Sequence, residues 1–68
     1  MTLKQTLILA AKKHAEAEIE LHKANIEVYM QQVVGIGEHS DIIETIQKEL
    51  DKMAQAHDRL EMLNKYFD

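Results

Sequence analysis

Three of the four histidines and two glutamates are the residues of this 68-residue chain whose types and spacing could do chemistry. His14, Glu18 and His22 recur every four residues, a spacing that places them along one line of a helix. If the chain folds back on itself near its middle, residues whose numbers sum to about 75 face each other, which sets Glu18 opposite His57 and His14 opposite Glu61. We therefore expect these five residues to form a half-buried polar network between two helices.

A metal-binding bundle is one interpretation of this network. Imidazole and carboxylate groups on facing helices can hold zinc or a pair of iron ions, with His14, Glu18, His22 and His57 as ligands. However, the di-iron bundles need a glutamate three residues before a metal-binding histidine, and Ala54 stands there before His57. We favour a network that holds no metal or cofactor, in which ion pairs fix the register of the two helices.

Catalysis is not indicated by the sequence, which has no Cys and one serine, Ser40, so it offers no pattern for nucleophilic or thiolate chemistry. The Gly35-Ile36-Gly37 segment lacks the following lysine and the preceding strand of a phosphate-binding loop. A bundle of this size also lacks the concave pocket that enzymes use. We expect a protein that is not an enzyme.

Charge and hydropathy exclude two further classes. The formal net charge of −4 argues against a nucleic-acid partner, which normally requires a basic face. The apolar run at residues 7–11 ends at Lys12 and Lys13, and it is too short for a signal peptide or a membrane span. We expect a soluble, cytoplasmic protein that does not bind membranes.

The elements that must position these residues are two helices in a single domain, residues 1–68. The sequence has no proline, and its two glycines lie close together, so Gly35 or Gly37 is the expected helix cap. Thr2 with Gln5 and Asp41 with Glu44 have the spacing of capping boxes at helix starts. We predict a helix over 3–34, a loop over 35–40 and a helix over 41–66, which is an all-α, antiparallel two-helix hairpin.

Apolar residues at alternating spacings of three and four predict how the helices pack. The expected seam of the second helix comprises Ile43, Ile46, Leu50, Met53, His57, Leu60, Asn64 and Phe67. The expected seam of the first helix comprises Ile8, Ala11, Ala15, Ile19, His22, Ile26, Tyr29 or Met30, and Val33.

The first helix carries a second apolar seam that one neighbouring helix cannot bury. It comprises Leu3, Leu7, Ala10, Ala17, Leu21, Ala24 and Val28. We interpret it as a protein interface through which hairpins pair into a four-helix bundle, as a homodimer or tetramer. The sequence thus favours a structural, adaptor or regulatory protein, and an alternative is a regulator that captures a helix of a host protein on this seam.

Three stretches resemble small helical proteins encoded by large tailed phages of marine cyanobacteria. They are residues 23–29 (KANIEVY), 35–41 (GIGEHSD) and 60–67 (LEMLNKYF), and the similarity spans most of the chain. The resemblance implies a viral origin and a bacterial cytoplasm, with a virion or host protein as partner. It implies no activity for any residue.

Overall fold

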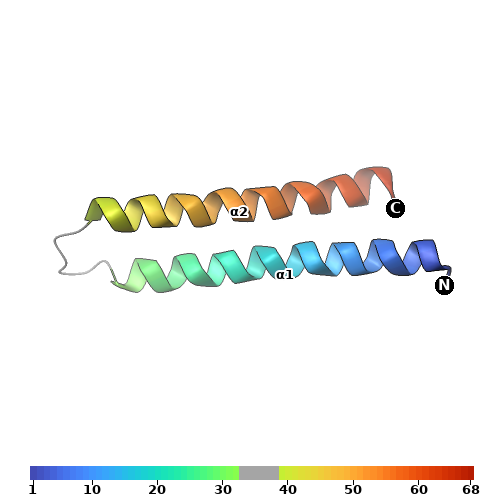
Figure 1. Ribbon diagram of the computed structural model, residues 1–68, viewed down its shortest axis with the longest axis horizontal. Helices are drawn as coiled ribbons and strands as arrows, with labels where there is room; N and C mark the ends of the chain where they lie inside the picture. Colours follow the sequence, from blue (N-terminus) through green and yellow to red (C-terminus); the bar gives the residue numbers. More distant parts are fainter. Residues whose placement is uncertain (33–38) are drawn as a thin grey trace.

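Two long helices lie side by side and antiparallel in the computed structural model, which describes residues 1–32 and 39–68 and the side chains of 1–31 and 41–68 (Figure 1). Helix α1 spans Leu3–Gln32 and helix α2 spans His39–Tyr66. The radius of gyration is 15.8 Å, whereas a globular chain of this length would have about 11 Å. The prediction of an all-α antiparallel hairpin is confirmed, and the molecule is a rod of 54 × 16 × 11 Å.

The start of α1 is capped as predicted. The backbone N–H of Thr2 donates to Gln5 Oε1 (2.9 Å), and the backbone N–H of Gln5 donates to Thr2 Oγ1 (3.1 Å). These reciprocal bonds satisfy two N–H groups that have no partner within the helix. The predicted capping box is therefore present at this end.

The start of α2 differs from the prediction, because the helix begins at His39, two residues before the expected position. Asp41 consequently lies in the first turn, where its negative charge favours the helix N-terminus, and its carbonyl accepts a hydrogen bond from Thr45 Oγ1 (2.9 Å). The predicted end of the first helix at 34, most of the predicted loop and the glycine cap lie outside the described residues.

The face of α1 that packs on α2 is close to the predicted seam. Seven of its buried and half-buried residues recur at alternating spacings of four and three, as in a left-handed coiled coil. They are Ile8, Lys12, Ala15, Ile19, His22, Ile26 and Tyr29, and Glu18 and Asn25 are half-buried beside this row. Lys12 takes the position predicted for Ala11, which is exposed.

The predicted seam of α2 is wrong by one residue at several positions. Ile43, Leu50, His57 and Asn64 are exposed, and so is Phe67. The observed seam comprises Ile42, Ile46, Glu49, Met53, Ala56, Leu60 and Leu63. One residue is about 100° around a helix, so this shift turns a different row of side chains toward α1.

The hairpin has a small core. Among the side chains that the structure describes, Ala15, Ile26 and Ala56 are the buried ones, and two of these are alanines. Small buried residues let the helix axes approach closely, but they remove little apolar surface from water. The accessible surface of the chain is 5332 Å², whereas a compact monomer of 7.9 kDa would expose about 4,400 Å². The excess is about 900 Å².

Candidate interaction surface

Every residue of the second apolar seam of α1 is exposed. We call it the outer stripe, and it comprises Leu3, Leu7, Ala10, Ala17, Leu21, Ala24 and Val28. At about 100° per residue, its centre lies about 150° around α1 from the face that packs on α2. The outer stripe therefore points away from the hairpin mate, and α2 cannot cover it.

A second exposed apolar area lies on α2, where Ile43 and Leu50 stand one residue beyond the packing seam. Leu50 and Met53 line a shallow hollow there with Ile19 of α1, and His57 forms part of its rim. This area is interrupted by the polar residues His57 and Asn64 toward the end of α2. It is shorter than the outer stripe, whose apolar residues span 3–28.

Of the predicted polar network, only His22 lies in a largely buried interhelical contact. Its Nδ1 lies 2.5 Å from Glu49 Oε2, and the side-chain amide of Asn25 donates to the same oxygen (3.3 Å). The side chains of His22 and Glu49 are only 12% and 13% exposed. A carboxylate can only accept, so the Nδ1 of His22 carries the proton in this bond.

Glu49 is held in its ionised form by these donors. The hydrogen bond from His22 lowers the pKa of Glu49 below its ordinary value of 4.5, and the bond from Asn25 and the nearby charges of His22 and Lys52 act in the same direction. Partial burial opposes them, because it disfavours the charged form. The pair thus joins the middle of the two helices through a charged group.

The other predicted pairs do not form. His14 and His57 are exposed and pair along their own helices, with His14 Nδ1 at 2.9 Å from Glu18 Oε1 and His57 Nδ1 at 4.0 Å from Glu61 Oε2. Across the helices, Glu18 instead accepts a hydrogen bond from Arg59 (3.4 Å). The reason is the shifted seam, which turns His57 away from α1.

Sequence reasoning missed Glu49, Asn25 and Arg59 as interhelical partners. Glu49 had a detectable signal, because it shares a seven-residue spacing with Ile42, Ala56 and Leu63 on the observed seam. Asn25 and Arg59 carry no such signal. Their side chains reach the partner helix from the edge of the contact, where residue spacing alone does not reveal pairing.

The alternative ligand set of His14, Glu18, His22 and His57 is not assembled by this geometry. Among the side chains of residues 1–31 and 41–68, no three His, Asp or Glu lie close enough together to hold a metal ion. Neither of the two described helices is long and apolar enough to cross a membrane.

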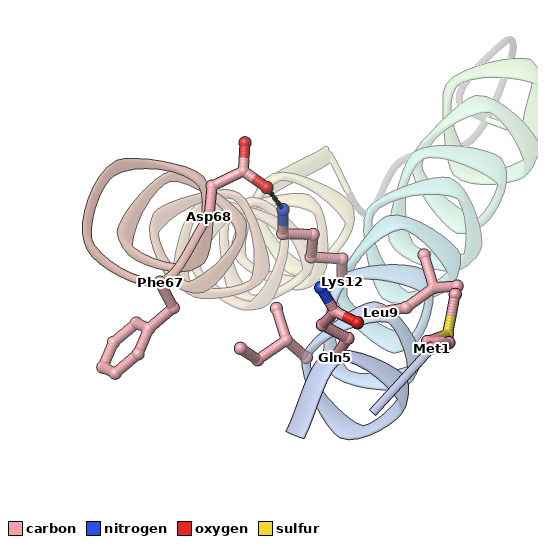
Figure 2. A pocket seen from close by; sticks show the side chains of 7 residues that line it. Met1, Gln5, Leu9, Lys12, Phe67 and Asp68 are labelled. Atoms are coloured by element: carbon pink, nitrogen blue, oxygen red, sulfur yellow. Dashed lines mark hydrogen bonds and ion pairs between the residues drawn. The ribbon is translucent and has the colours of Figure 1, made fainter. Parts of the chain in front are cut away.

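The open end of the hairpin, where both termini lie, carries a shallow hollow (Figure 2). Met1, Gln5 and Leu9 line it from one chain end, and Phe67 and Asp68 line it from the other. Lys12 Nζ reaches across to Asp68 Oδ1 at 2.5 Å, as Figure 2 shows. Because Asp68 is largely exposed, this ion pair contributes little to stability.

Comparison with protein-family models, with curated proteins and with solved structures finds no match for this chain. The resemblance to phage proteins stays a prediction.

Proposed function

We propose that this chain is a non-enzymatic helical hairpin that associates with a second copy of itself through the outer stripe, and that it acts as a small structural or adaptor protein. The observation that carries the proposal is the imbalance between the buried and exposed apolar surface. Among the residues whose side chains the structure describes, three are buried. Four large apolar side chains, Leu3, Leu7, Leu21 and Val28, lie exposed along the outer stripe.

The energetics of a short chain support association. A core in a chain below about 70–80 residues rarely supplies more than about 3–5 kcal/mol, and this hairpin has no disulfide to add to it. The excess exposed area of about 900 Å² is close to the roughly 800 Å² that each partner buries in an interface of standard size. A second copy on the outer stripe would account for most of that excess.

The position of the stripe determines the shape of the assembly. Each helix in a square four-helix bundle has two contact faces about 90° apart, whereas the two faces of α1 are about 150° apart. A dimer through the outer stripe therefore places the two α1 helices in the middle and the two α2 helices outside. This is a flatter arrangement than the four-helix bundle that the sequence suggests.

A pair of matched lysine substitutions tests the proposal. Leu21 on the outer stripe and Leu50 on α2 are 55% and 48% exposed in the hairpin, so neither substitution removes a core side chain. Burying the exposed half of the Leu21 side chain in the interface stabilises the dimer by about 1 kcal/mol for each chain. Both copies carry the change, so Leu21→Lys should weaken a dimer by at least about 2 kcal/mol, or about 30-fold.

The masses of both variants and of the unaltered chain would be measured by size-exclusion chromatography with light scattering. We expect the unaltered chain and Leu50→Lys to be dimeric and Leu21→Lys to be monomeric at the same concentration. If Leu50→Lys dissociates and Leu21→Lys does not, the interface lies on the other apolar area. A capture module for a foreign helix would instead be monomeric without any substitution.

A further inference from the structure

We infer that the two copies pair antiparallel along the outer stripe, about a two-fold axis between residues 15 and 16, so that Leu7 faces the partner's Ala24 and Ala10 faces the partner's Leu21. This inference rests on the proposed function, since it specifies the direction and register of the same association. The order of large and small residues along the stripe and the charges beside it both favour this direction.

From Leu7 to Val28, the stripe alternates large and small residues at regular heptad steps, and Leu3 adds a further large residue at its start. His14 occupies the one remaining step between Ala10 and Ala17, and it is exposed like its neighbours. Residues at these spacings occupy two kinds of heptad position, called a and d. In an antiparallel pair, each layer joins an a position of one helix with a d position of the other. The layers are Leu3 with Val28, Leu7 with Ala24, Ala10 with Leu21, and His14 with Ala17, each occurring twice.

The three inner layers therefore each combine one larger residue with one alanine. Helix axes separate by 8–10 Å depending on the side chains between them, so layers of similar total size favour one constant separation. The layer of two larger residues, Leu3 with Val28, falls at the ends of the contact, where helices can diverge. Antiparallel packing thus fits the stripe without internal strain.

A parallel pair in register would not have this property. Layers of two alanines at residues 10, 17 and 24 would alternate with layers of two leucines at 7 and 21, and the separations that these layers favour differ. It would also place the two His14 rings against each other. In the antiparallel pair His14 lies on the partner's Ala17, while its Nδ1 keeps the Glu18 carboxylate 2.9 Å away on its own helix.

Charges beside the stripe agree with the antiparallel direction. Lys13 and Glu20 flank the stripe on the same side, and the two-fold axis brings each Lys13 next to the partner's Glu20. On the opposite flank, Lys4 approaches the partner's Asn25, and Glu18 approaches an alanine. Glu18 already forms an ion pair with Arg59 of its own chain. None of these flanking contacts brings two like charges together.

Distances between single spin labels test this arrangement. The chain has no cysteine, so Thr6→Cys, Glu16→Cys and Glu27→Cys each accept one label, and all three positions are exposed. At 1.5 Å per residue, the antiparallel pair separates the two labels by about 30 Å at position 6 and about 35 Å at position 27, but by less than about 20 Å at position 16. The labelled chains would be measured by electron paramagnetic resonance, with sedimentation and helix content checked on the same samples.

Three separations that are shortest at position 16 and longer on both sides support the inference. Similar short separations at all three positions mean a parallel pair, and any other pattern in a dimer means a different interface or register; either overturns the inference while association itself stands. A monomeric mass with no interchain signal overturns the proposed function as well.

As a second measurement, Lys13→Glu should weaken the dimer several-fold, and the double variant with Glu20→Lys should restore its affinity. A lack of restoration contradicts the antiparallel register.

Discussion

Replacing two isoleucines with alanine tests which face of each helix forms the hairpin contact. Ile26 is 6% exposed on the packing face of α1, and Ile43 is 55% exposed on α2, one residue beyond the observed seam. The chemical change is the same at both sites. The expected effects on the free energy of unfolding differ, because only Ile26 loses buried contacts.

The magnitudes follow from burial. Ile26→Ala removes about three methyl or methylene groups from the core, each worth about 0.8 kcal/mol, and leaves a cavity, so we expect a loss of about 2–4 kcal/mol. At Ile43 about half of that apolar surface is already in water. The higher helix propensity of alanine offsets about 0.4 kcal/mol, which leaves a net loss below about 1 kcal/mol.

Urea unfolding followed by circular dichroism at 222 nm, at one fixed protein concentration, measures both losses. Because a chain of this size has only about 3–5 kcal/mol from its core, Ile26→Ala should lose most of its stability and unfold at a much lower urea concentration, while Ile43→Ala should unfold close to the unaltered chain. Equal losses, or a larger loss at Ile43, would refute the observed register and favour the seam that runs through Ile43 and Leu50.

Three further predictions concern single polar groups. Glu49 has a lowered pKa, so its ionisation stabilises the fold above pH 4.5 and this contribution is lost as the pH falls below 4.5; Glu49→Gln should remove that part of the acid dependence in urea unfolding measured between pH 3 and 7. Thr2→Ala removes the cap of α1 and should lower the free energy of unfolding by about 1 kcal/mol, whereas Thr2→Ser should retain it. Lys12→Met keeps the packing of the side chain and loses only the exposed ion pair with Asp68, so thermal unfolding should show a change below about 0.5 kcal/mol.

The sequence predicts α1 better than α2 because the apolar residues of α1 separate into two distinct rows. Ala15, Ile19, His22 and Ile26 all lie on the packing face as expected, and every residue of the outer stripe is exposed. Lys12 is unexpected in the packing row, since its long apolar stem can pack while its ammonium group reaches the surface, and Asn25 is unexpected beside that row.

In α2, two candidate rows lie one residue apart, and the prediction follows the wrong one. Leu50 is more apolar than Glu49, which favours the predicted row, but Ala56 and Leu63 are more apolar than His57 and Asn64, which favours the observed row. The actual contact buries Glu49 because His22 and Asn25 satisfy its oxygen, and it buries Ala56 because the helices approach closely. Both causes belong to the pair of helices and are not visible in one helix alone.

The same limitation explains the errors in the polar network. The predicted pairing of Glu18 with His57 assumes the wrong row of α2, and in the structure Glu18 contacts Arg59 instead. A polar interhelical contact of His22 is expected from the sequence, but the prediction does not use the seven-residue spacing that marks its partner Glu49 as a seam residue. Partner choice depends on rotation of α2 about its own axis, which the apolar pattern leaves ambiguous.

Sedimentation equilibrium of the unaltered chain, from low micromolar to millimolar concentration, tests the central proposal most directly. Self-association through the outer stripe predicts a mass twice the 7.9 kDa of one chain, with dissociation only at the dilute end. A folded species of 7.9 kDa throughout that range would contradict the proposal, because the outer stripe of α1 would then be stable in water without a partner.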